Sequence, residues 1–479
     1  MKINKLIYPL LAATLIIASC KKSFLDEENP TAVTVNSSIS NPSAMADAVN
    51  GMYNAMKNYT LFDRDIPVLG DLLADNIYVN VSNSGRYLSE NNYTFINTSA
   101  EAADIYNQGY YSILQANRII YEGRKLPTSN DVNQLLGEAY ASRGLLYLEM
   151  VNWFGAPYAL SPTAPGVALV TLPSYVTGFA IKPARNTVTA VYNQIISDLD
   201  SAYTLMPTTG TTLHATSSDF IAKYAAKAIE ARAYLYKGDY PNALAAALIV
   251  INNGGYTFAQ TPAAFNAFWA NPVATPSKLE TIFELNQNAS SSNGINGLDD
   301  IYSQSGYGDL QATTDLYNAY TATDVRRTLI LNGTRGGQQA YIVNKFPNYT
   351  NTDKDETKVI RYAEVVLTAA EAYARTGDEF DAKIQLNTLA KLRDPSFAGY
   401  TSTGAQLITD ILNERRKELA FEGLRFFDFT RLNLPITRPA QAQGYASYPF
   451  VSTTDFRRIQ PIPQSAMDAN SSLTQNPGY

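Results

Sequence analysis

The sequence predicts a mainly α-helical protein whose helices are interrupted by long irregular loops. Apolar residues recur at helical spacing along most of the chain, beginning with Ala44, Ala48 and Met52. Segments rich in Pro, Gly, Ser, Thr, Asn and Tyr separate these stretches, and one helix-pair pattern occurs twice. Of the 479 residues 46% are hydrophobic, which is ample for a sizeable core. Because no long linker divides the chain, we predict a single domain over residues 41–479.

The N-terminal segment has the features of an export signal. Lys2 and Lys5 precede a 13-residue apolar run that ends at Ala18. Such a run is typical of a signal peptide and shorter than the roughly 20 residues that span a membrane. Small residues then lead directly to Cys20, as in bacterial lipoprotein signals.

We therefore predict that residues 1–19 are a lipoprotein signal peptide and that residues 20–40 form a lipidated N-terminus and tether. An ordinary secretory signal followed by an incidental cysteine is the alternative. Cys20 is the only cysteine of the chain, so no intramolecular disulfide can form. Lipidation explains this lone thiol better than redox or nucleophilic chemistry does.

Composition excludes several other functions. The net charge is −6 and no basic run occurs, which argues against nucleic-acid binding. The chain has one histidine, His214, so it lacks the ligands of a His/Cys zinc site and offers little to a Ser-His-Asp triad. We expect His214 to be a solvated loop residue. No nucleotide-binding glycine motif is present, and we predict neither metal nor cofactor.

Helices are predicted along the chain in a regular order, and two have readable ends. Thr187 precedes an apolar stripe and is expected to cap the helix that it begins. Gly423 follows an apolar run and is expected to end the helix before it. After the helix that starts at Ser43, we predict helices over residues 100–124, 131–153, 187–206, 218–237, 241–253, 358–376, 379–393 and 405–422.

The repeated pattern predicts helix pairs of the tetratricopeptide type. The pattern A-x-A-Y-x3-G-D-x3-A begins at Ala231 and again at Ala370, 139 residues later. Small residues allow the two helices to approach closely, and Gly-Asp forms the turn between them. The large offset indicates scattered hairpins, not a tandem array.

Four loops separate these helices, over residues 154–186, 254–315, 394–404 and 432–479. A short strand is predicted at 281–285. Long irregular segments on a helical frame are where binding surfaces usually lie.

Two charged helices are interpreted as structural. In the first, Arg361 and Glu364 are expected to pair, as are Glu371 and Arg375. The second alternates charges beside aromatic residues over 413–431, which predicts a partly buried ion network. Glu414 and Glu418 could form a catalytic acid and base pair there, but charged helical faces are far more often structural.

These helices carry a family resemblance. The stretches IRYAEVVL and NERRKELAFEGLRFFDFTR closely resemble signatures of the SusD/RagB family of Bacteroidetes lipoproteins. The resemblance extends over nearly all of the chain after the signal. It includes NRII at 117–120, NWFGAP at 152–157, RNTV at 185–188, IQPIP at 459–463 and the terminal QNPGY.

The resemblance implies a SusD-like helical scaffold with tetratricopeptide-type pairs and an irregular, ligand-binding half. It implies a non-enzymatic, lipid-anchored protein of the outer membrane, facing the cell exterior. Such proteins capture a glycan, or in some relatives a peptide or other nutrient, for a SusC-like TonB-dependent transporter. It identifies no ligand residue, because ligand residues vary with the substrate.

Candidate ligand residues follow from composition instead. Sugars bind through apolar faces and hydroxyl groups, which aromatic platforms beside polar side chains complement. The chain has 33 Tyr, 19 Phe and 2 Trp. The loop-borne candidates are Trp269, Tyr302 and Tyr307, with a second group of Asp75, Asn76, Tyr78, Arg86 and Tyr87. Packing of single aromatic residues onto the helices is the competing interpretation, and Trp153 is assigned to the core.

Two other functions remain open. A surface glycoside hydrolase would use two carboxylates about 5–10 Å apart, and the chain has 43 acidic residues from which such a pair could come. A structural or adhesive surface lipoprotein is the other alternative.

Overall fold

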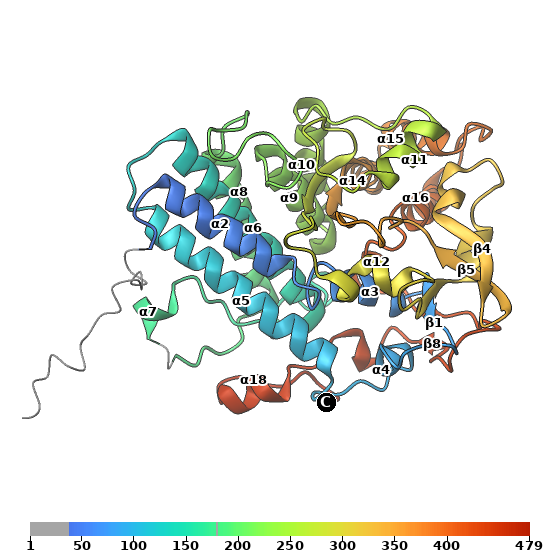
Figure 1. The fold of residues 1–479 in the computed structure, drawn as a ribbon, viewed down its shortest axis with the longest axis horizontal. Helices are drawn as coiled ribbons and strands as arrows, with labels where there is room; N and C mark the ends of the chain where they lie inside the picture. Colours follow the sequence, from blue (N-terminus) through green and yellow to red (C-terminus); the bar gives the residue numbers. More distant parts are fainter. Residues whose placement is uncertain (1–37, 179–180) are drawn as a thin grey trace, which may run out of the picture.

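The computed structural model describes residues 38–178 and 181–479. The predicted signal peptide, Cys20 and the tether up to residue 37 lie outside the described residues. Helices dominate the structure, and strands β1, β4 and β5 of the largest sheet lie at one end of it (Figure 1). The mainly α-helical fold class is therefore confirmed.

The long helices pack in series, each against the next. The order of packing is α2, α5, α6, α8, α9, α10, α14, with α15 and α16 both against α14 (Figure 1). Their bounds are α2 Pro42–Met56, α5 Ala100–Gly123, α6 Asn130–Phe154, α8 Val188–Leu205, α9 Lys223–Lys237, α10 Tyr240–Asn253, α14 Tyr362–Arg375, α15 Glu379–Arg393 and α16 Gly404–Glu418.

The repeated sequence pattern forms two helix hairpins, as predicted. In the α9–α10 pair, Gly238 adopts the left-handed conformation (φ 78°) and the Asp239 side chain accepts from the N–H of Asn242. In the α14–α15 pair, Asp378 caps the second helix in the same way. Helix α10 packs directly against α14, so hairpins 139 residues apart in sequence are neighbours in space.

Of the two predicted helix ends, the one at Thr187 is confirmed and the one at Gly423 is wrong. The Thr187 side chain accepts from the N–H of Ala190 and caps α8, as expected. Helix α16, however, ends at Glu418 and not at Gly423. Gly423 lies in the following turn (φ 80°), where an added Cβ would come 2.7 Å from the Cα of Pro67. This glycine thus allows two backbone segments to approach closely.

The strands form three small antiparallel sheets. The largest has the order β1 (Ile77–Val79), β3 (Leu310–Ala312), β5 (Gln338–Val343) and β4 (Ile330–Arg335). Strand β2 (Thr281–Leu285), which was predicted, pairs with β6 (Thr357–Arg361), and β7 (Ile436–Thr437) pairs with β8 (Phe450–Val451). Short elements complete the chain: α3 Asp65–Leu72, α4 Leu88–Asn91, α7 Ser174–Thr177, α11 Pro262–Ala270, η3 Gly294–Asn296, α12 Leu298–Tyr302, α13 Thr314–Asn318, η4 Val325–Leu329, α17 Arg425–Arg431, η5 Phe456–Arg458 and α18 Gln464–Ala469.

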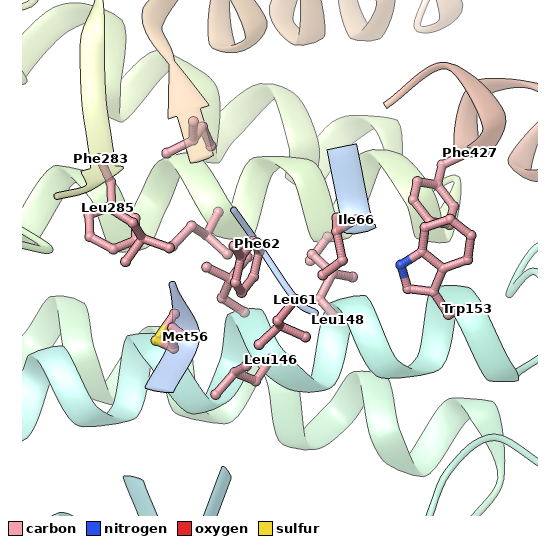
Figure 2. Close-up of a cluster of buried hydrophobic side chains, with 14 of the residues drawn as sticks. Met56, Leu61, Phe62, Ile66, Leu146, Leu148, Trp153, Phe283, Leu285 and Phe427 are labelled. Atoms are coloured by element: carbon pink, nitrogen blue, oxygen red, sulfur yellow. The ribbon is translucent and has the colours of Figure 1, made fainter. Parts of the chain in front are cut away.

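A continuous apolar core joins the helices to strand β2. Figure 2 shows Met56 of α2 and Leu146 of α6 in one cluster with Phe283 and Leu285 of the strand. Trp153 belongs to this core, as predicted, and its ring contacts Phe427 edge-on at a centroid distance of 4.8 Å. Burial of such aromatic side chains contributes much of the stability of a core.

The charged helices form a fully buried ion network. Glu418 accepts from Arg326, Arg361 and Arg393, at 3.2, 3.1 and 3.0 Å. Burial opposes its charge, but Arg393 and then Arg361 outweigh burial and hold the pKa of Glu418 well below its usual range. Glu414, also buried, bonds to Arg326 at 2.6 Å. Both carboxylates therefore serve the scaffold.

One predicted ion pair of the first charged helix does not form. Arg361 belongs to strand β6 and pairs with Glu280, Glu418 and Glu422, while Glu364 bonds to Arg232 at 2.6 Å. Because the helix begins only at residue 362, Arg361 and Glu364 are not one helical turn apart.

The predicted environment of His214, a solvated loop, is also wrong. It is buried, its ring stacks on Phe220 at 3.9 Å, and Nδ1 bonds to the Glu138 carboxylate at 2.9 Å. Glu138 also accepts from Tyr53 at 2.8 Å. Polar sequence around a histidine does not reveal a distant carboxylate that draws its ring inside.

In the described part of the chain, no helix has the length and apolarity needed to cross a membrane.

Candidate ligand-binding face

The largest sheet brings the two predicted candidate segments together. Strand β1 follows Asp75 and Asn76, and strand β3 follows Tyr307; the two strands pair with Tyr78 opposite Gln311. Segments more than 200 residues apart in sequence thus become neighbours at one end of the molecule (Figure 1).

An arginine–tyrosine pair connects the loops that flank these strands. The guanidinium carbon of Arg86 lies 3.6 Å from the centre of the Tyr307 ring. Both side chains are partly exposed. A stacked guanidinium and an accessible aromatic ring offer a ligand polar and apolar contacts side by side.

Arg335 adds a second cation to the same place. Its Nη2 donates to the carbonyl oxygens of Tyr307 and Ser82, at 2.7 and 2.9 Å. Arg335 ends strand β4, just before a turn made by Gly336 and Gly337, both with positive φ. Two central residues with positive φ give a turn whose twist matches that of the two strands of a hairpin. We call Arg86, Tyr307 and Arg335 together the arginine–tyrosine face.

Hydrogen bonds to Asp309 hold the loop that carries Arg86. Asp309, which is fully buried, accepts from the backbone N–H and the hydroxyl of Ser84. Ser84 in turn accepts from Nη1 of Arg86 at 2.7 Å. The position of the guanidinium is therefore defined before any ligand arrives, which lowers the entropy lost on binding.

Four of the predicted site residues are held in the scaffold by partners outside this face. Asp75 is bonded to Arg425 at 2.8 Å, and Asn76 donates to Asp71 at 2.6 Å. Tyr78 donates to Gln311 at 3.0 Å, and burial raises its pKa to about 12. The remaining one, Tyr87, is buried and donates to Asp65. All four side chains are buried, so the expectation that they contact ligand is corrected.

Trp269 and Tyr302 also require correction as ligand platforms. Trp269 is 3% exposed, and its ring covers cations of the buried network, with Lys345 at 4.4 Å and Arg361 at 5.0 Å. Tyr302 is 1% exposed and stacks on Phe346 at 6.0 Å. Both rings are core residues in this structure, so of the eight predicted contacts only Arg86 and Tyr307 reach the surface.

Sequence reasoning missed Arg335, and it missed a second aromatic pair that lies outside the arginine–tyrosine face. Tyr317 of α13 stacks on Tyr341 of β5 at 4.1 Å, and Arg327 lies 4.5 Å from the Tyr317 ring centre. The available signal was Gly336-Gly337 between two polar segments, which is a hairpin pattern. Because strands expose alternate residues, Arg335 and Tyr341 point to opposite faces of the sheet.

A broad groove of about 960 Å³ crosses the helical half between α6, α8 and α9. No predicted candidate lines it. Its charged groups are largely paired: Asp200 with Lys227 at 2.9 Å and Lys237 with Asp239 at 3.3 Å. The cations of the arginine–tyrosine face, in contrast, retain unused donors.

Comparison with known proteins supports the predicted family. Residues 327–479 match the family described as SusD family, and residues 23–235 match one described as starch-binding associating with outer membrane. The two matches together cover most of the chain, and both support the SusD/RagB family that the motifs predicted. It is 28% identical to SusD-like protein P2 of Formosa agariphila over 532 residues, with both chains covered completely.

Solved structures agree with this assignment. A putative sugar binding protein from Bacteroides vulgatus is similar with a TM-score of 0.83 and 28% identity, over 92% of this chain and 99% of that one. A SusD superfamily protein from Bacteroides thetaiotaomicron gives a TM-score of 0.83 and 27% identity, over 91% and 99%. The predicted SusD-like fold is thus confirmed.

Proposed function

We propose that this protein captures a glycan at the arginine–tyrosine face and delivers it to a SusC-like TonB-dependent outer-membrane transporter. The observation that carries the proposal is the stack of Arg86 on Tyr307, accessible from solvent and built from two distant segments. An aromatic ring offers a surface for the C–H groups of a sugar, and the guanidinium offers donors for its oxygens.

Similarity to the SusD/RagB family supports a binding role without catalysis. One similar structure is described as a putative sugar binding protein, and one matched family as starch-binding and associating with the outer membrane. We propose further that Cys20 carries the lipid anchor, that residues 41–479 form one domain, and that the domain faces the cell exterior.

The test is a glycan and peptide panel against the protein beginning at Lys21, which retains every described residue. We expect one glycan class to bind, with unchanged ligand recovered afterwards. Y307A should weaken binding by about tenfold, since it removes the ring and the support of Arg86. Y111A is the matched control, because Tyr111 is an exposed tyrosine on α5.

Each alternative has its own result in this panel. Peptide binding without glycan binding would replace the ligand class, and cleavage products would establish a glycoside hydrolase. Equal losses in Y307A and Y111A would remove the arginine–tyrosine face from the proposal. Co-purification with a large TonB-dependent barrel from outer membranes tests the partner.

A further inference from the structure

The cations of the arginine–tyrosine face differ in their partners from those of the buried ion network around Glu418. Arginines of that network bond to carboxylates, as Arg393 does to Glu280 at 2.7 Å. Other buried arginines, such as Arg438, bond only to uncharged oxygens and leave no comparable set of donors at the surface. Within residues 38–178 and 181–479, neither Arg86 nor Arg335 forms an ion pair. Their hydrogen bonds go to a hydroxyl and to backbone carbonyls.

These bonds leave several N–H groups unused. A guanidinium has five N–H donors in a planar fork. Arg86 directs Nη1 at Ser84, and its Nε and Nη2 have no acceptor among the described residues. Arg335 uses Nε and Nη2, so its Nη1 is left without a described acceptor.

Neighbouring carboxylates do not cancel this positive charge. Asp309 is fully buried and bonded to Ser84, so it contributes one charge beneath two cations. Asp300, whose carbonyl accepts from the Tyr307 N–H, is itself paired with Lys354 at 2.9 Å. A protein with a net charge of −6 thus presents an excess of positive charge at this face.

We propose that the arginine–tyrosine face selects glycans that carry anionic groups, namely uronate carboxylates or sulfate esters. The inference rests on the proposed function and names the ligand class of the same site. A guanidinium fork matches two oxygens of a carboxylate or a sulfate, and such charge-assisted bonds are about twice as strong as neutral ones. The Tyr307 ring then contacts the sugar that carries the anion.

The experiment uses full-length protein in detergent and pairs of oligosaccharides that differ only in charge. One pair is an oligogalacturonide and its carboxyl-reduced form; the other is a sulfated galactan oligosaccharide and its desulfated form. Calorimetry on both pairs separates the uronate source from the sulfate source. R86Q is the main variant, because Arg86 makes a single side-chain hydrogen bond and its loss leaves the loop intact.

R327Q is the matched control. Arg327 also lies over a tyrosine, at 4.5 Å, and also lacks an ion pair among the described residues. Its partner Tyr317 stacks on Tyr341, which points to the opposite face of the sheet from Arg335. Arg327 therefore matches Arg86 in chemistry but not in position.

We expect at least one charged ligand to bind roughly tenfold or more tightly than its neutral counterpart, with affinity that falls as salt rises. R86Q should reduce this ratio to about threefold or less, and R327Q should preserve it. Equal binding of charged and neutral forms, or a preference unaffected by R86Q and by R86Q/R335Q, would overturn the inference while the proposed function stands. Failure to bind any glycan would overturn both.

Discussion

Replacement of Glu356 by glutamine should change the pH dependence of stability in a direction that the structure fixes. Glu356 is 2% exposed and accepts the backbone N–H of Gln287 at 2.9 Å. Burial, followed by repulsion from Glu284, raises its pKa to about 9 from the model-compound value of 4.5. The folded protein therefore keeps this carboxyl protonated at neutral pH, while the unfolded chain releases the proton.

The sign and size of the effect follow from proton linkage. Between pH 4.5 and pH 9 the unfolded state binds fewer protons at this site, so stability falls as pH rises, by about 1.4 kcal/mol per pH unit. From pH 5 to pH 7.5 the wild type should lose about 3 kcal/mol through Glu356 alone. E356Q keeps an acceptor for Gln287 but has no proton to release, so it avoids this loss.

Urea unfolding followed by tryptophan fluorescence measures the difference, since Trp153 and Trp269 are both buried. The gap in unfolding free energy between E356Q and the wild type should widen by about 3 kcal/mol from pH 5 to pH 7.5. Contributions of titrating groups that do not interact with Glu356 are shared by both proteins and cancel. D47N, at an exposed acid of α2, controls for the removal of one charge. Parallel pH profiles for E356Q and the wild type would refute the reasoning.

Three further predictions test the packing and the anchor. W269A should lower the unfolding free energy by about 3–5 kcal/mol; a loss of ligand affinity at unchanged stability would return Trp269 to the binding site. G423A places a Cβ 2.7 Å from the Cα of Pro67 at a positive φ, and should cost about 2 kcal/mol in thermal unfolding; an unchanged melting temperature would contradict that contact. C20A should move the protein from the membrane fraction to the soluble fraction, and continued membrane attachment would count against lipid anchoring.

Features of the fold that depend on residues close in sequence could be predicted, whereas contacts between segments far apart in sequence could not. The turns at Gly238-Asp239 and Gly377-Asp378 depend on residues close in sequence, so the two hairpins were predictable. The side-by-side packing of those hairpins depends on surfaces 139 residues apart. The same limit explains Arg361, whose partners Glu280 and Glu418 are 81 and 57 residues away.

In the candidate site, sequence also fails to separate the environments of two residues that are close together in the chain. Tyr302 and Tyr307 are five residues apart in one loop-rich segment and have similar polar neighbours in sequence. Tyr302 ends helix α12, whose residues are all buried, whereas Tyr307 lies beyond the following turn, in the irregular segment before strand β3. Composition identified both tyrosines as candidates, but only the packing of α12 decides which ring meets solvent. Arg335 gave no signal beyond the glycine pair that follows it.

The protein uses the same pair of residue types, arginine on an aromatic ring, in two environments with opposite energetic requirements. Arg361 over Trp269 is fully buried, so its charge must be matched by Glu280, Glu418 and Glu422. Arg86 over Tyr307 is partly exposed, so water can solvate the donors that the protein leaves unused.

Substitution should therefore separate stability from binding. R361Q leaves buried carboxylates without their cation and should lower the unfolding free energy by roughly 3–5 kcal/mol. R86Q should change it by about 0.5 kcal/mol or less, as at other surface positions. Urea unfolding of both variants under one condition checks the pair. Comparable losses would mean that the arginine–tyrosine face is part of the scaffold; the expected contrast would mean that ligand preference can change at residue 86 while the fold is preserved.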